Sequence, residues 1–237
     1  MNIILVESSE IRDGRCVLTD RRAEHLRTFL HAEPGRRFRL GIADGPQGWG
    51  TVTACDGARV AFDVDCSEPS PEPWFDLILA IPRPRSLKRI FFQTAAMGVR
   101  NIWLVGAERV EKSYFSMHLL RPEEYRPVLF EGLMQARTTR VPTVTAVPKL
   151  RDLWALLPED ASLRLIANPA ERAPDFTRHR GPGLPLIAVG PDGGWTDAEN
   201  TRFAENGFEP MTLGIRPLRT DTAVIALAAV VQDRLGR

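Results

Sequence analysis

Residues 186–199 read LIAVGPDGGWTDAE, and this stretch decides how the second half of the chain is built. Its first four apolar residues predict a buried strand, and a glycine-rich turn ends that strand. Thr196, followed three positions later by Glu199, has the spacing of a capping box that begins a helix. Ligands of open α/β sheets bind beyond the carboxyl ends of the strands. The turn at residues 190–194 is therefore either a small-molecule site or simply a tight turn that needs glycine.

On both sides of this unit, strand and helix patterns alternate. Strands are expected at residues 76–81, 101–105, 163–167, 186–189 and 208–213. Helices are expected at about residues 197–206 and 222–235, and upstream of Gly98, where Ser86 is the predicted N-cap. Such alternation is typical of a mostly parallel sheet with helices on both faces. We therefore predict an α/β domain over residues 76–237.

Residues 1–66 follow a different pattern. Short β-type runs at residues 3–6, 15–18, 36–42, 50–54 and 59–64 are separated by turn residues, with one helix near residues 22–30. Closely spaced short strands are typical of a small barrel. Prolines at alternate positions between residues 69 and 73 stiffen the chain that follows. We therefore expect a separate N-terminal domain and a linker at residues 67–75.

Composition narrows the class of protein. With 237 residues, 43% of them hydrophobic and 26% charged, the chain can bury one or two cores. No stretch reaches the about 18 apolar residues of a membrane span, and the first residues lack a signal-peptide pattern, so we expect a soluble cytoplasmic protein. The three cysteines, Cys16, Cys55 and Cys66, form no C-x-x-C pair. We expect reduced, mostly buried thiols and no metal site.

Charge is distributed unevenly along the chain. Residues 1–75 carry nine Lys and Arg against twelve Asp and Glu, a net charge of −3, and the remaining residues carry 22 against 18, a net charge of +4. Residues 77–107 and 132–151 contain basic but no acidic side chains. Such surfaces can contact a phosphate backbone, although ordinary solvated arginines explain them equally well.

A second loop, LGIRPLRTDTA at residues 213–223, joins a strand end to a helix start. Its two arginines and its Thr220-Asp221 pair are more charged and polar groups than a simple connecting loop requires, which makes the loop a candidate functional segment. The default interpretation of Thr220 or Asp221 is nevertheless the N-cap of the following helix. Residues 223–231 are apolar on nearly all sides. This pattern predicts a helix buried in a core or against another subunit.

Taken together, the two loops resemble the C-terminal signature of the SPOUT (trefoil-knot) methyltransferases, in the group that methylates N3 of a uridine in 16S ribosomal RNA. The matching residues are VGPDGGW at 189–195, Glu199, Gly207-Phe208 and L-G-x-R-x-L-R-x-D-T-A at 213–223, preceded by Gly98-Val99, Glu108-Arg109-Val110, Glu131 with Gln135, and Arg140-Val141-Pro142. His25 and Gly35 fit the family's N-terminal PUA-like barrel. Asp192 and Asp221 stand where the family usually has Glu, and Pro217 replaces an aliphatic residue.

This resemblance implies a trefoil-knotted C-terminal domain, a small N-terminal PUA-like β-barrel that binds RNA, and a homodimer whose subunits share the acceptor pocket. It also implies S-adenosylmethionine as the cofactor, held largely by backbone groups. The residues expected to bind it are Leu165, Ile166, Ala167, Val189, Gly190, Pro191, Gly193, Gly194, Leu213, Gly214, Leu218, Thr220 and Thr222.

For the chemistry, a guanidinium can stabilise the uracil anion that forms when N3–H loses its proton. Arg219 is the first candidate and Arg216 the second, and Asp221 is a candidate proton relay, although its capping role is preferred. The target nucleotide must be unpaired or flipped out. The expected backbone contacts to small-subunit ribosomal RNA are Arg83, Arg85, Lys88, Arg89, Arg137 and Arg140.

Two other functions fit the same residues. One is an RNA-binding or ribosome-assembly module that keeps the knotted fold with little or no catalysis. The other is an enzyme that binds a phosphate ligand at residues 190–194, which is disfavoured because no lysine or metal cluster accompanies the loop.

Overall fold

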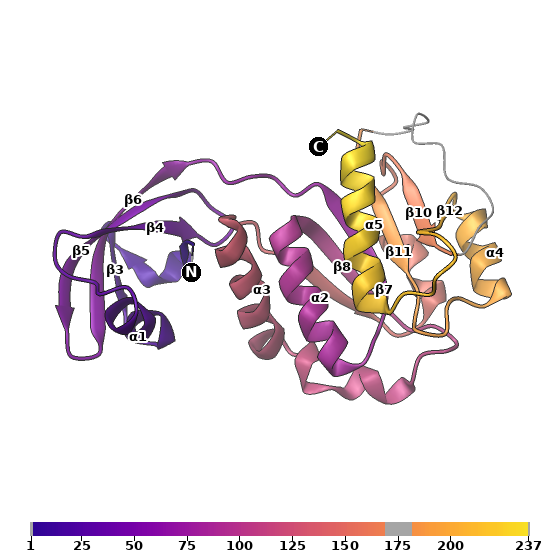
Figure 1. Ribbon diagram of the computed structural model, residues 1–237, viewed down its shortest axis with the longest axis horizontal. Coiled ribbons are helices and arrows are strands. Elements are labelled where there is room, and N and C mark those ends of the chain that lie inside the picture. The colour runs from indigo at the N-terminus through magenta and orange to yellow at the C-terminus, as the bar shows by residue number, and fades with distance from the viewer. Residues whose placement is uncertain (1, 169–181, 237) are drawn as a thin grey trace. The chain divides into compact units, whose positions relative to one another are not determined.

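A computed structural model describes residues 2–168 and 182–236, and the chain forms two compact units (Figure 1). One unit comprises Met1–Glu72 and Phe130–Val141, and the other comprises Pro73–Leu129 and Pro142–Arg237. Residues 130–141 thus join the N-terminal unit, which the sequence pattern did not indicate. The mixed α/β class predicted from the sequence is confirmed.

The first unit is a six-stranded sheet in the order β1-β4-β5-β6-β3-β2. Its strands are β1 (Ile4–Val6), β2 (Ile11–Arg12), β3 (Arg15–Leu18), β4 (Arg37–Ile42), β5 (Gln47–Asp56) and β6 (Arg59–Glu68). Strands β1 and β4 pair in parallel, and the other neighbours are antiparallel. Helix α1 (Arg21–Thr28) begins where the side chain of Asp20 accepts the Arg22 N–H. Leu18, Leu26, Leu40 and Phe62 are buried in this unit's core.

The second unit is a six-stranded sheet in the order β12-β10-β11-β7-β8-β9, and all of its neighbouring strands are parallel. Its strands are β7 (Phe75–Ala80), β8 (Val99–Val105), β9 (Thr143–Val147), β10 (Arg164–Ala167), β11 (Leu186–Val189) and β12 (Glu209–Met211). All six residues of β7 are buried, as expected for a central strand of a parallel sheet with both faces covered.

Helices cover this sheet on both sides. Helices α2 (Pro84–Met97) and α5 (Thr220–Arg234) pack side by side (Figure 1), and they contact β8 and β11, respectively. On the opposite face, Ile78 of β7 joins an apolar cluster with Leu153 and with Phe203 of α4 (Asp197–Glu205). The neighbouring strand residues Leu77 and Leu79 alternate to the other face, where α2 and α5 lie.

The predicted capping box is confirmed. Thr196 Oγ1 accepts the Glu199 N–H at 3.3 Å, and Glu199 Oε2 accepts the Thr196 N–H at 2.8 Å. Glu199 is 7% exposed, and its other oxygen accepts the backbone N–H of Glu108 at 2.8 Å. One carboxylate therefore fixes both the start of α4 and the segment that follows β8.

Two predicted helix starts are wrong. Helix α2 begins at Pro84 with Arg83 as N-cap, rather than at Ser86, because the fixed φ of proline suits the first helical position. Helix α5 begins at Thr220 with Arg219 as N-cap and no side-chain cap, so neither Thr220 nor Asp221 is the capping residue. The C-terminal stop at Gly98 is confirmed by its left-handed φ of 85°.

The sequence pattern also missed helix α3 (Pro122–Ala136) and the strands β2 and β9. Short 3₁₀ turns occupy Ser8–Glu10, Lys112–Ser116, His118–Leu120, Leu150–Asp152 and Trp154–Leu156.

Among the residues that the structure describes, no helix has both the length and the apolar character that crossing a membrane requires. The three cysteines are free, with Cys16 buried and Cys55 and Cys66 half-buried.

Candidate functional site

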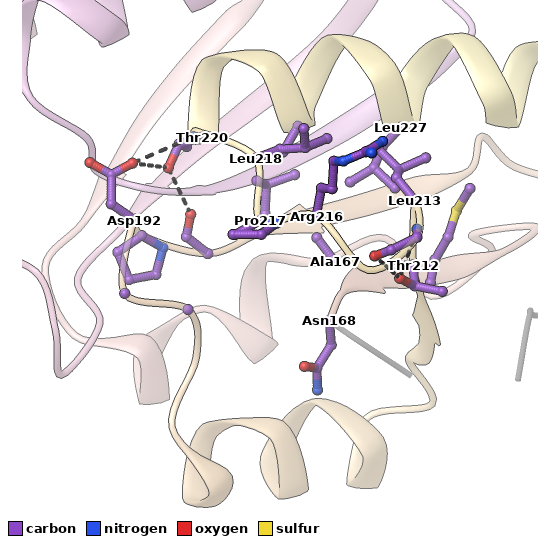
Figure 2. Close-up of a pocket in the computed structure, with 18 residues that line it drawn as sticks. Ala167, Asn168, Asp192, Thr212, Leu213, Arg216, Pro217, Leu218, Thr220 and Leu227 are labelled. Carbon is purple, nitrogen blue, oxygen red and sulfur yellow. Dashed lines mark hydrogen bonds between the residues drawn. The ribbon is translucent and has the colours of Figure 1, made fainter. Parts of the chain in front are cut away.

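A cavity of about 290 Å³ lies at the carboxyl ends of three neighbouring strands (Figure 2). Ala167, Val189 and Met211 are the last residues of β10, β11 and β12, and all three line it. The remaining walls come from Asn168, from the loop after β11, from the loop after β12 and from the first half of α5. The strand order thus brings together three chain segments that are separate in the sequence, as expected for ligand sites in parallel sheets.

The loop after β11 needs glycine for two physical reasons. A Cβ atom at Gly190 would lie 3.0–3.2 Å from the indole of Trp195, which is closer than ordinary packing allows. Gly194 has a φ of 70°, in the left-handed region. Residues 190–194 therefore form a tight turn that needs glycine, and they also form one wall of the cavity.

Helix α5 is tied to this loop through Thr220. The Thr220 hydroxyl lies 3.0 Å from Asp192 Oδ1 and 3.3 Å from the carbonyl oxygen of Gly190 (Figure 2). Thr220 is only 4% exposed, so water competes little for these hydrogen bonds. The loop after β12 has its own local bond, in which the Gly214 N–H donates to Thr212 Oγ1 at 3.2 Å.

The chemical character of the cavity can be compared with S-adenosylmethionine, the cofactor implied by the sequence resemblance. Met211, Leu213, Leu218 and Leu227 give apolar walls, and none of the described residues that line the cavity is a lysine. Asn168, Asp192, Arg216 and the backbone of the glycine loop supply polar groups. The volume is close to the lower end, about 300 Å³, of small-molecule pockets. These residues fit a ligand that has apolar parts and also carries hydroxyl, amino and carboxylate groups, as S-adenosylmethionine does.

Ten of the thirteen residues predicted to bind the cofactor line this cavity: Ala167, Val189, Gly190, Pro191, Gly193, Gly194, Leu213, Gly214, Leu218 and Thr220. Leu165, Ile166 and Thr222 do not. Leu165 and Ile166 lie inside β10 and are buried in the sheet, where only the last strand residue reaches the cavity. Thr222 is exposed on α5.

Sequence reasoning missed several lining residues, namely Asn168, Met211, Thr212, Ala223 and Leu227. Helical spacing could have found two of them, because Ala223 and Leu227 are four positions apart and share one face of α5. Met211 and Asn168 follow from the strand order, which the sequence alone did not supply.

The three predicted catalytic residues do not meet at one place. Arg216 lines the cavity at the ends of β10, β11 and β12, on the loop after β12, whereas Asp192 is on the loop after β11 (Figure 2). Arg219 instead lines a separate cavity of about 360 Å³, together with Arg83, Arg85, Ser86 and Arg89. Asp221 is 9% exposed, and its carboxylate pairs with Arg89 at 2.7 Å.

The predicted RNA contacts also separate into groups. Arg83, Arg85 and Arg89 share the cavity that Arg219 lines, whereas Lys88 is exposed on α2 and is not among its lining residues. Arg137 is exposed in the first unit, with a φ of 56°. In the same unit, Arg140 pairs with Glu72 at 2.5 Å and donates to the carbonyl oxygen of Asp44 at 3.3 Å. Within residues 2–168 and 182–236, no three His, Cys, Asp or Glu side chains are grouped as metal ligands.

Comparison with known proteins extends these observations. The model of the RNA methyltransferase domain family matches residues 68–232. Ribosomal RNA small subunit methyltransferase E of Treponema pallidum is 32% identical, over 98% of this chain and 90% of its own length. Ribosomal RNA small subunit methyltransferase E 1 of Borreliella burgdorferi is 26% identical, over 99% of each chain.

Among solved structures, the ribosomal RNA small subunit methyltransferase E from Neisseria gonorrhoeae, bound to S-adenosyl methionine, superposes with a TM-score of 0.78. It is 24% identical, and the match covers 98% of this chain and 97% of that one. A likeness at this identity shows a shared fold. With a family match over most of the chain and a relative above 30% identity along nearly its whole length, the chain belongs to the RNA methyltransferase family, beside the ribosomal RNA small subunit methyltransferase E proteins.

Proposed function

We propose that this chain is an S-adenosylmethionine-dependent methyltransferase that acts on N3 of a uridine in 16S ribosomal RNA. The observation that carries the proposal is the cavity formed by the ends of β10, β11 and β12 and by two glycine-bearing loops. It occurs in a chain whose relatives are named ribosomal RNA small subunit methyltransferases. The specificity for N3 of uridine rests on the resemblance of residues 189–199 and 213–223 to that group.

The cofactor would be held by the backbone of residues 190–194 and 213–214 and by the side chains of Asn168, Leu218 and Leu227. When bound, it supplies an electrophilic methyl group. The protein's own residues orient that group, exclude water with apolar side chains, and hold the acceptor in line with it. The sequence-based candidates for stabilising the anionic uracil, Arg219 and Arg216, both lie on the loop between β12 and α5, and Asp221 positions Arg89 through their ion pair.

We infer that the C-terminal part of the chain forms a trefoil knot and that residues 1–66 form a PUA-like RNA-binding barrel, with residues 67–75 as linker and 76–237 as the SPOUT domain. Two features support the knot. Strand β12 pairs with β10 rather than with β11, which precedes it in the chain. The loops after β11 and β12 are also joined by the hydrogen bond from Thr220 to Asp192.

We further propose that the protein is a cytoplasmic homodimer that binds ribosomal RNA. The exposed Arg83, Arg85 and Arg219 support the contact with RNA. Support for the dimer comes from α5, where the apolar side chains of Ile225 and Val230 remain partly exposed. The neighbouring Ile215 is fully exposed. A second subunit would cover these apolar groups and share the acceptor pocket.

Two experiments test the function. Calorimetry should detect S-adenosylmethionine binding, and an absence of heat at millimolar cofactor would contradict the proposed cofactor. Mass spectrometry of ribosomal RNA from cells that lack the protein should show one uridine without its methyl group. Complete methylation in those cells, together with RNA binding by the purified protein, would instead favour the assembly module.

A further inference from the structure

A second cavity, of about 200 Å³, shares a wall with the cofactor cavity. Pro191, Asp192 and Gly193 line both. Its other walls are Ile81 and Pro82, which follow β7, the adjacent Arg83, and residues from the segment after β8, namely Arg109, Val110, Glu111 and Tyr114. It therefore lies at the carboxyl edge of the same sheet. Any group bound in it is next to the ligand of the first cavity.

The polar side chains of this second cavity are two guanidinium groups, the carboxylates of Glu111 and Asp192, and a phenol. Arg109 donates a hydrogen bond to the carbonyl oxygen of Gly193, which holds it against the glycine loop. Glu111 Oε1 accepts from the Ser113 hydroxyl at 2.7 Å. A guanidinium has five N–H donors and a carboxylate has about four acceptor positions, so both groups can bind a further partner.

A third cavity, defined above by Arg83, Arg85, Ser86, Arg89 and Arg219, adjoins the second through Arg83, which lines both. In the part of the chain that the structure describes, its five lining residues are four arginines and Ser86, with no carboxylate among them. Arg83 is the N-cap of α2 and Arg219 is the N-cap of α5, so the positive ends of two long helices add to the charge of the side chains. The ion pair with Asp221 holds Arg89 in place.

We propose that the second and third cavities form the acceptor-nucleotide site, with the uracil base in the second cavity beside Asp192 and a phosphate of the same nucleotide among the four arginines. This inference rests on the proposed function. The order of the three cavities, joined by Arg83 and then by residues 191–193, places phosphate, base and methyl donor in sequence along one edge of the sheet.

The polar groups of the second cavity match the edge of uracil. Uracil presents an N3–H donor between two carbonyl acceptors, and Glu111 can accept from N3–H while Arg83 and Arg109 donate to the carbonyl oxygens. The Tyr114 ring offers a stacking surface of the kind that holds unpaired bases. Cytosine has no N3–H, so the Glu111 carboxylate would face its N3 lone pair. The site therefore selects uracil, and Arg219 contacts the phosphate instead of the base.

The test measures equilibrium binding of uridine monophosphate through the NMR chemical-shift changes of the nucleotide. The full-length protein is saturated with S-adenosylhomocysteine so that no methyl transfer occurs. Uridine monophosphate should bind about tenfold more tightly than cytidine monophosphate. Arg85→Gln and Arg219→Gln should each weaken the binding of uridine monophosphate by about fivefold to tenfold, and inorganic phosphate should compete with the nucleotide. Arg202→Gln, which removes an exposed charge on α4, is the control and should leave binding unchanged.

Glu111→Gln should reduce the preference for uridine over cytidine, whereas Glu108→Gln should not. The same binding measurements on each variant, repeated with a single-stranded RNA that contains one uridine, distinguish binding of an RNA phosphodiester from binding of a free nucleotide. Equal binding of the two monophosphates, loss of binding in Arg202→Gln, or displacement of S-adenosylhomocysteine by uridine monophosphate would overturn the proposal. Because the cofactor is measured separately for each variant, failure of the acceptor site is distinguishable from failure of the proposed function.

Discussion

The hydroxyl of Thr220 lies 3.0 Å from the carboxylate of Asp192, and this contact joins the first turn of α5 to the loop after β11. The two residues are 28 positions apart in the sequence, and both line the cofactor cavity. A hydroxyl carries a single proton, so Thr220 donates either to Asp192 or to the carbonyl oxygen of Gly190, which is 3.3 Å away. Either bond holds the two loops at a fixed separation.

Replacing Thr220 with valine should therefore weaken cofactor binding. The substitution keeps the shape of the side chain and removes the hydroxyl, which costs about 1 kcal/mol, or about fivefold in the dissociation constant. Calorimetry with S-adenosylmethionine measures the change. Thr222→Val is the matched control, because Thr222 is exposed and does not line the cavity. Equal losses in both variants would contradict the role given to Thr220.

Gly190→Ala should destabilise the fold as well as the cavity. The new methyl group would lie 3.0–3.2 Å from the Trp195 indole, which is buried in the cluster under α4. Overpacking of this kind costs about 1–3 kcal/mol, which lowers the melting temperature by about 2–4 °C for each kcal/mol in a chain of this size. Differential scanning calorimetry checks the prediction. Gly57→Ala is a useful comparison, since its Cβ meets no atom within 4 Å and only backbone strain applies. An unchanged melting temperature in Gly190→Ala would mean that the indole moves freely.

Acid should destabilise the first unit through Arg22. The Arg22 guanidinium lies 2.5 Å from Glu10 and 2.8 Å from Asp20. Partial burial raises the pKa of both carboxyls, but hydrogen bonds from Arg22 and its positive charge outweigh burial, so each pKa lies below its ordinary value. The unfolded chain then binds more protons than the folded one in acid. This stabilisation is present near neutral pH and is lost as the pH falls below the ordinary values of 4.5 and 3.8.

The measurement is urea unfolding at several pH values between 7 and 3. Arg22→Gln should lower the free energy of unfolding at pH 7 by about 2–3 kcal/mol and flatten its dependence on pH. Arg21→Gln is the matched control, because its ion pair with Glu131 is exposed and such pairs contribute about 1 kcal/mol or less. Parallel pH profiles for wild type and Arg22→Gln would refute the assignment.

Two of the three thiols should resist alkylation in the folded protein. Burial raises the pKa of Cys16 to about 11, with a contribution from the negative charge of Glu10, and burial together with Asp65 does the same for Cys66. Because the thiolate is the reactive form, both should react with iodoacetamide at pH 8 at least about 100-fold more slowly than in the unfolded chain. Peptide mass spectrometry gives the rate at each site. A Cys16 rate that is the same before and after unfolding would contradict this environment.

The sequence predicts most of this fold where the signals are local. The strand at residues 186–189, the turn after it and the capping box of α4 involve neighbours within four positions, and all three are present. Helix α3 escaped prediction because Pro127 interrupts its pattern, and β9 escaped because most of its short run is not buried. Ser86 was a wrong cap because Arg83 and Pro84 already begin the helix.

The loops that form the site could be predicted from the sequence, but the positions of its charged side chains could not. Glycine-rich turns after buried strands indicate a possible site, and the family resemblance implies ten of the residues that line the cavity. The environments of Arg219 and Asp221 depend instead on α2, which lies far away in the sequence and contributes Arg83, Arg85 and Arg89. No local sequence pattern reveals the ion pair between Arg89 and Asp221. A role can be assigned to each arginine only once the packing of α5 against α2 is known.

The order of strands in the parallel sheet also bears on how the protein is made. Strand β7 pairs with β11 and is central in the finished sheet, yet more than a hundred residues separate them along the chain. During synthesis, β7 and α2 leave the ribosome without β11 and α5, which complete their burial. The nascent domain therefore exposes this central strand, whose six residues are all buried in the finished sheet, until residues 186–234 have emerged. Apolar surface exposed in this way is prone to aggregation and is what chaperones protect.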